Sequence, residues 1–129
     1  MEEPVWIRDN VVPAIHNRQL AEHGGASGVR DLGLLESALD APKNRWLYKK
    51  CCIEELAACY AYHLVMNHPF IDGNKRTAWV CMRLFLKLNG LDIGADRQEK
   101  VRTILDLSAG RMELEELAAW IKARVRRLK

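Results

Sequence analysis

The chain has 129 residues, of which 49% are hydrophobic and 29% charged, with a formal net charge of +3. This size suits one domain, residues 1–129, and excludes a second core. No run approaches the roughly 20 apolar residues that cross a membrane, and the start M-E-E-P-V-W lacks the features of a secretory signal. We therefore expect a cytoplasmic protein, and the mild charge does not argue for nucleic acid.

The cysteines and histidines are scattered, with no C-x-x-C or H-x-x-x-H spacing. We expect reduced, packed thiols and no zinc site. The residues concerned are Cys51, Cys52, Cys59 and Cys81, and His16, His23, His63 and His68.

The first predicted helix follows a short extended start at residues 5–7. Asp9 is its expected N-cap, Pro13 lies in its first turn, and Gly24 ends it after His23.

A second helix is predicted to begin after Asp31, an N-cap residue, and to stop at Pro42. Residues 43–52 mix cations with aromatic residues and have no clean period. We interpret that stretch as a short hairpin or exposed flap.

Two helices that are apolar nearly all round are predicted over residues 53–67 and from about residue 77 to Asn89. Helices of this kind lie inside a protein, so the segment between them is held by the core at both ends.

The last predicted helices follow a connector at residues 91–95. Asp96 is expected to cap a helix that Gly110 ends and that carries Val101, Ile104, Leu105 and Ser108 on one side. A final helix is predicted from an unbroken apolar stripe, with basic residues in its last half that match the helix dipole. The stripe comprises Leu114, Leu117, Ala118, Ile121, Val125 and Leu128. The fold class is therefore all-α, with about six helices and a short β-hairpin flap.

The segment between the two apolar helices reads H-P-F-I-D-G-N-K-R over residues 68–76. Histidine is suited to accept a proton at neutral pH, so His68 is the candidate general base. Asp72 is a hard oxygen ligand of the kind magnesium prefers. The following residues open a helix, whose first N–H groups and positive dipole bind phosphate. Gly73, Asn74, Lys75 and Arg76 are the candidate phosphate-binding residues. Together these groups indicate phosphoryl or nucleotidyl transfer.

This nine-residue signature resembles that of the Fic/Doc family, and specifically its death-on-curing (Doc) toxin branch. The wider family has a second glycine at the position of Lys75, whereas the Doc branch resembles this chain in having a lysine there. Residues 28–39, G-V-R-D-L-G-L-L-E-S-A-L, and residues 114–120, L-E-E-L-A-A-W, also resemble Doc-type chains.

The resemblance implies a compact helical bundle whose flap, assigned here to residues 43–52, docks the target. It implies that His68 activates a hydroxyl of the target protein and that Asp72 binds Mg²⁺. It also implies that Asn74 and Arg76 hold the phosphates of ATP, with Gly73 in the anion-binding turn.

Most of the family transfers AMP from ATP, whereas the Doc branch transfers the terminal phosphate to a threonine of elongation factor Tu and halts translation. Lys75 fills space and adds charge where a glycine would leave the backbone open to a phosphate. ATP could then bind with its triphosphate in the opposite direction, which favours transfer of the terminal phosphate, as in a kinase. Adenylyl transfer is the alternative.

No serine or threonine here begins the inhibitory pattern [ST]-x-x-x-E-[GN] of many Fic proteins. The resemblance implies control by a small antitoxin whose disordered tail folds onto the toxin. A different reading is a non-catalytic helical module that binds nucleic acid through Lys43, Arg45, Lys49, Lys50 and the C-terminal cations.

Overall fold

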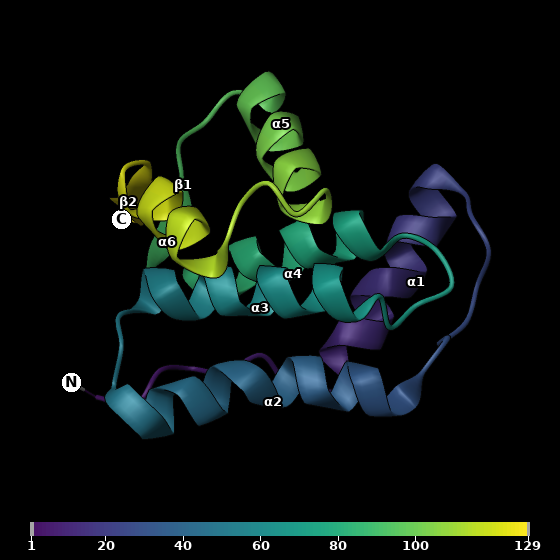
Figure 1. The fold of residues 1–129 in the computed structure, drawn as a ribbon, viewed down its shortest axis with the longest axis horizontal. Helices are drawn as coiled ribbons and strands as arrows, with labels where there is room; N and C mark the ends of the chain where they lie inside the picture. The colour runs from purple at the N-terminus through teal and green to yellow at the C-terminus, as the bar shows by residue number, and fades with distance from the viewer. Residues whose placement is uncertain (1, 129) are drawn as a thin grey trace.

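The two apolar helices predicted around the motif form the centre of the molecule. A computed structural model describes residues 2–128, which form six helices and one two-stranded antiparallel sheet. α3 (Ile53–Asn67) and α4 (Asn74–Leu88) pack against each other in the middle, as the sequence predicted (Figure 1). The predicted all-α class is confirmed.

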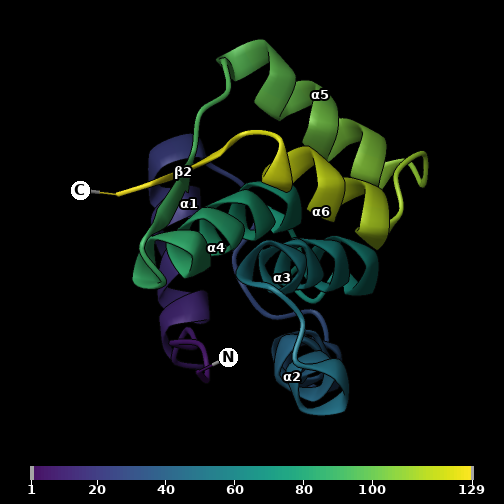
Figure 2. The same cartoon turned by 90° about the vertical axis from the view of Figure 1, so that its left-hand side faces the viewer.

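The remaining helices cover this central pair. α2 (Leu32–Lys49) packs on one side of α3 and α6 (Leu114–Lys122) on the other, while α1 (Val11–His23) lies against α4. Figure 2 shows α2 below the central pair and α5 (Arg97–Ser108) and α6 above it. No described helix is long and apolar enough to span a bilayer.

α2 continues through Pro42, so the predicted stop at that residue is wrong. The helix tolerates the missing N–H because one buried stripe runs along its whole length: Leu35, Ala38, Leu39, Pro42 and Trp46. The proline ring is itself part of the buried face, and tertiary packing therefore outweighs the local cost of the proline. The predicted flap at residues 43–52 is also wrong, because most of it is the last part of this helix.

The predicted final helix ends early, at Lys122. Beyond it, β2 (Val125–Arg127) pairs antiparallel with β1 (Leu91–Ile93), which lies in the predicted connector. Val125 is thus a strand residue opposite Ile93. Arg124 still donates to the carbonyl of Trp120 at 3.2 Å, near the C-terminus of α6, whereas Arg126 and Arg127 lie in β2.

The predicted cap at Asp9 is also wrong. The N-cap of α1 is Asn10, whose side chain makes no capping hydrogen bond. The prediction was correct for the other two caps, since Asp31 accepts from the N–H of Leu34 at 3.0 Å and Asp96 from that of Glu99 at 2.8 Å.

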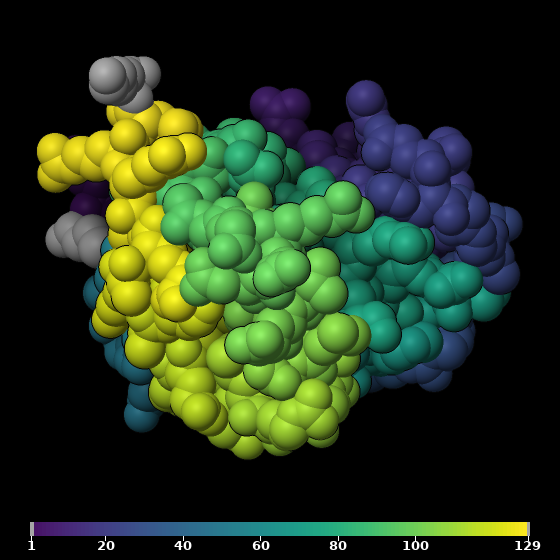
Figure 3. Space-filling view, turned by 90° about the horizontal axis from the view of Figure 1, so that it is seen from above, coloured from purple at the N-terminus to yellow at the C-terminus, as the bar shows by residue number. Residues whose placement is uncertain are grey.

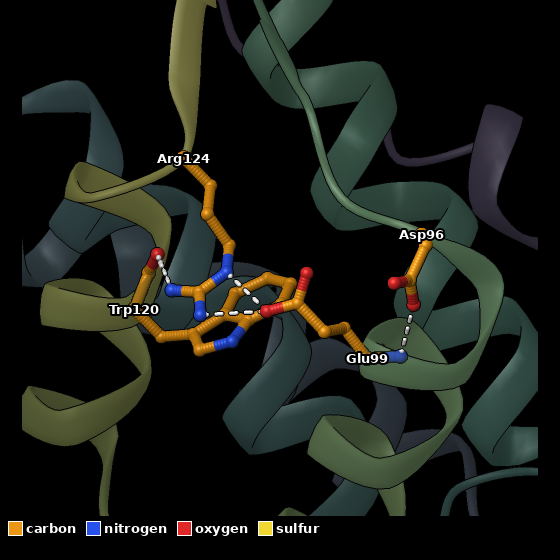
Figure 4. Close-up of polar contacts among 4 residues, drawn as sticks. All are labelled: Asp96, Glu99, Trp120 and Arg124. Atoms are coloured by element: carbon orange, nitrogen blue, oxygen red, sulfur yellow. Dashed lines mark hydrogen bonds and ion pairs between the residues drawn. The ribbon is translucent and has the colours of Figure 1, made fainter.

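Charged side chains hold the C-terminal third in place. Arg83 of α4 donates two hydrogen bonds to buried Asp92, at 2.9 and 3.1 Å, and these lower the pKa of that carboxyl to about 2. Arg124 donates twice to Glu99 of α5, at 2.9 and 2.7 Å, with its guanidinium over the Trp120 ring (Figure 4). The first pair ties β1 to α4, and Arg124 ties α5 to the end of α6.

Candidate active site

The motif loop joins the end of α3 to the start of α4. His68 is the C-cap of α3 and lies in the left-handed region, with φ 48° and ψ 55°. Gly73, with φ 77°, is the N-cap of α4. A left-handed histidine is uncommon and must be held by its surroundings.

All six residues predicted for the site line one hollow of about 890 Å³. They are His68, Asp72, Gly73, Asn74, Lys75 and Arg76. The other walls come from α1 and α5, and Figure 3 shows the green surface of α5 beside the teal surface of the motif segment. The sequence therefore identified one side of the hollow, and the fold supplies the rest.

The start of α4 presents three N–H groups to this hollow. Within residues 2–128, no acceptor is found for the backbone N–H of Asn74, Lys75 or Arg76. The Lys75 and Arg76 side chains are exposed and form no ion pair with another described residue. Unpaired N–H groups, the helix dipole and two free cations together form a site for phosphate.

Asn74 has a structural role that the sequence did not reveal. Its side chain is buried, accepts from the N–H of Phe70 at 3.0 Å and donates to the carbonyl of Phe70 at 2.9 Å. The amide thus closes the loop across four residues and satisfies two buried backbone groups. Its predicted contact with phosphate stays a prediction.

Asp72 is exposed at the rim of the hollow and is held by backbone groups. Its Oδ1 accepts from the N–H of Gly73 at 2.8 Å, and its Oδ2 lies 3.4 Å from the N of Ala26. A Cβ on Gly25 would lie 2.8 Å from Oδ2, so only glycine allows this approach. The described residues contain no cluster of three or more metal-ligating side chains. A single carboxylate beside an anion-binding helix start is the kind of donor that magnesium uses together with phosphates and water, and the predicted binding of magnesium by Asp72 stays a prediction.

Arg30 holds the end of α3 that carries His68, and the sequence analysis did not identify it. Its Nε donates to the carbonyl of His68 at 2.7 Å and its Nη2 to that of Asn67 at 2.9 Å. A cation on the last carbonyls of a helix complements the dipole and fixes the chain direction there. Arg30 thus supports the unusual backbone of the candidate base.

The extended segment beside the motif loop is residues 24–31, not the predicted residues 43–52. The N–H of Arg30 donates to Pro69 O at 2.7 Å, the N–H of Ile71 donates to Gly28 O at 3.1 Å, and Val29 forms an antiparallel bridge with Phe70. The segment in the position expected for a flap therefore precedes α2.

The four residues predicted to share one side of α5 do share one side, and all of them line the hollow: Val101, Ile104, Leu105 and Ser108. The fully buried residues of α5 are instead Thr103 and Leu107, whereas Val101 and Leu105 are 49% and 45% exposed. Other lining residues that the sequence analysis did not single out are Gln19, Val65, Trp79, Val80, Arg97 and Lys100. The hollow thus has apolar, aromatic and cationic surface in addition to the motif residues.

The basic cluster considered for nucleic acid is partly neutralised. Arg45 Nη1 and Lys49 Nζ both lie 2.7 Å from Glu55 Oε2. Burial would raise the pKa of Glu55, but the hydrogen bonds from Lys49 and Arg45 outweigh it and lower the pKa. Lys43 Nζ also lies 3.4 Å from Asp9 Oδ1, so three of the four cations have an acidic partner within the described residues, which weakens the interpretation as a binding module.

Comparison with known proteins identifies the group of proteins that this site resembles. The sequence model of the Fic/DOC family matches residues 6–86, which include the whole motif loop. The chain belongs to the Fic/Doc family. α5 and α6 lie outside the matched residues, so the family model covers the motif side of the hollow and leaves out the α5 wall.

Two relatives belong to the Doc branch by name. The protein kinase doc of Escherichia phage P1 is 30% identical over 106 residues, which are 81% of this chain and 83% of that protein. The toxin Doc of Mycolicibacterium smegmatis (strain ATCC 700084 / mc(2)155) is 41% identical over 76 residues, which are 57% of this chain and 58% of that toxin. The predicted resemblance to the death-on-curing branch is confirmed.

Proposed function

We propose that this protein is a toxin that transfers the terminal phosphate of ATP to a hydroxyl of a target protein. The observation that supports the proposal is the gathering of the His68 imidazole, the Asp72 carboxylate and the start of α4, with its unpaired N–H groups, around one hollow of about 890 Å³. A hollow of that size is within the range that binds ligands such as nucleotides. The names of the two relatives, a toxin and a protein kinase, support this choice of activity.

In this proposal, a ring nitrogen of His68 takes the proton of the target hydroxyl. The hydroxyl oxygen then bonds to the γ-phosphorus while the bond from phosphorus to the bridging oxygen breaks, and ADP leaves with the electron pair. The N–H groups at the start of α4, with Lys75 and Arg76, hold the phosphates and balance the charge that develops.

Magnesium would be held by Asp72, and when bound it would neutralise phosphate charge. The target by family resemblance is a threonine of elongation factor Tu, and such a modification would arrest translation.

Lys75 favours phosphoryl over adenylyl transfer. It is the second residue of α4 and exposed in the hollow, where the wider family pattern has glycine. Its side chain occupies the space above the first turn, and its charge attracts the most anionic part of the triphosphate. We infer that the terminal phosphate therefore lies at the reacting end.

The choice between phosphoryl and adenylyl transfer is tested by finding which phosphate of ATP becomes bound to the target protein. The protein is incubated with Mg²⁺, elongation factor Tu and ATP that is labelled either at the γ or at the α position. We expect protein-bound label from γ-labelled ATP alone. Label from α-labelled ATP would establish adenylyl transfer, and no label from either would reject this target.

We also propose that a small antitoxin controls the protein by docking on α5. Val101 and Leu105 form an exposed apolar ridge that also lines a second hollow of about 630 Å³. That hollow contains Arg97, Arg102 and Arg111, of which Arg111 pairs with Asp106 in the same hollow, so Arg97 and Arg102 supply its positive charge. An acidic amphipathic segment fits such a surface.

Arg102 lines only the second hollow, so Arg102→Glu separates docking from catalysis. The candidate partner is the small protein encoded upstream. We expect this variant to weaken the partner's binding at least tenfold, measured by calorimetry, with phosphate transfer unchanged. The control is Glu36→Arg, a charge reversal at an exposed position of α2 that lines neither hollow, and it should leave the partner's binding unchanged. Unchanged binding would remove α5 as the docking surface.

A further inference from the structure

His16 lies against the motif loop although it is far away in the sequence. Its side chain belongs to α1 and is only 2% exposed. Its ring stacks on Phe70 with centroids 3.8 Å apart and an interplanar angle of 7°. Its Nε2 lies 2.7 Å from the backbone oxygen of Asp72. The His16 side chain thus contacts the motif loop at two points, the ring of Phe70 and the backbone of Asp72.

The hydrogen bond has a defined direction. A backbone carbonyl only accepts, so Nε2 carries the proton and donates to Asp72. The ring also packs on the next residue, since a Cβ on Gly73 would lie 3.6 Å from Cδ2 and Nε2 of His16. His16 therefore restrains the backbone of Asp72 and Gly73, and not the Asp72 carboxylate directly.

We infer that His16 is a positioning residue that aims the Asp72 carboxylate at the bound metal. The inference rests on the proposed function, in which Asp72 holds magnesium. The donor fixes the carbonyl of Asp72, and the N–H of Gly73 fixes Oδ1 at 2.8 Å, so the Cα–Cβ direction of Asp72 is set from two sides. Groups that orient a metal ligand in this way typically affect metal affinity or activity about 10- to 100-fold.

A purely structural role makes a different prediction. If the ring only fills space against Phe70, phenylalanine replaces it without loss of function. If the hydrogen bond matters, glutamine, whose Nε2 can reach Asp72 O, preserves function better than phenylalanine does. His16→Phe and His16→Gln thus separate the two contacts.

The test compares ATP binding by calorimetry with and without Mg²⁺. We expect His16→Phe to weaken ATP binding in Mg²⁺ about 10- to 100-fold while binding without Mg²⁺ changes less than about twofold, and His16→Gln to stay within about fivefold of the wild type under both conditions. His63→Phe, on α3 and outside the hollow, is the control for histidine replacement.

Equal Mg²⁺-dependent binding by His16→Phe and wild type would overturn the inference, as would an equal loss with and without Mg²⁺. If His16→Phe does not fold, His16→Asn decides, because its amide nitrogen stops short of Asp72 O and the same Mg²⁺-specific loss is expected. If the wild type itself binds no ATP in Mg²⁺, the proposed function fails, not only the role of His16.

Discussion

Replacement of His68 is expected to lower phosphate transfer about 10²- to 10⁴-fold, the usual contribution of a general base. ATP binding should change little, because the phosphates are assigned to the start of α4. The measurement is the initial rate of label transfer from γ-labelled ATP at saturating nucleotide, alongside an ATP titration.

The choice of substitute matters because His68 has φ 48°. His68→Asn is the better variant, since asparagine tolerates left-handed backbone and cannot act as a base at neutral pH, whereas His68→Ala adds backbone strain. Both variants should lose activity to a similar extent. The control His63→Ala removes a half-buried imidazole from α3, the helix that His68 caps, and should keep the wild-type activity. If His68→Asn keeps more than a fifth of the wild-type rate, His68 is not the base.

Replacement of Phe85 by alanine is expected to reduce the free energy of unfolding by about 3–5 kcal/mol. Phe85 is fully buried in α4, stacks on Trp6 with centroids 5.8 Å apart and meets Tyr60 at 5.0 Å. Its loss leaves a cavity where the N-terminal segment, α3 and α4 meet. Urea unfolding followed by circular dichroism measures the effect.

Leu88→Ala is the matched control for this experiment. Leu88 lies three residues further along the same helix and is 41% exposed, so its truncation should cost less than about 1 kcal/mol. Similar losses for the two variants would show that the core is not centred where α3 and α4 place it.

The central helices and the motif could be predicted because their signals are local. Residues 53–67 were predicted as one helix and form α3 with the same bounds. The residues that predict the site at 68–73 are consecutive in the sequence, so the motif is visible without the structure. In both cases the side chains that define the element are neighbours in the chain.

The errors arose where distant contacts outweigh local preference. Pro42 is a strong local stop, yet α2 continues because the ring and Trp46 share a buried face. Val125 continues the apolar spacing of α6, yet pairs with Ile93 of β1. His16 and Arg30 escaped notice because each bonds to a backbone carbonyl of the motif, and no sequence pattern marks a carbonyl acceptor.

The two sides of the hollow are anchored unequally. The motif side rests on the buried centre of α3 and α4, whereas α5 buries only Thr103 and Leu107 and is tied by Arg124 to Glu99. Segments with few buried apolar contacts open locally at lower free energy than the core does. We therefore expect the α5 side of the hollow to open more readily than the motif side, so that a bound molecule would exchange while the motif residues keep their positions.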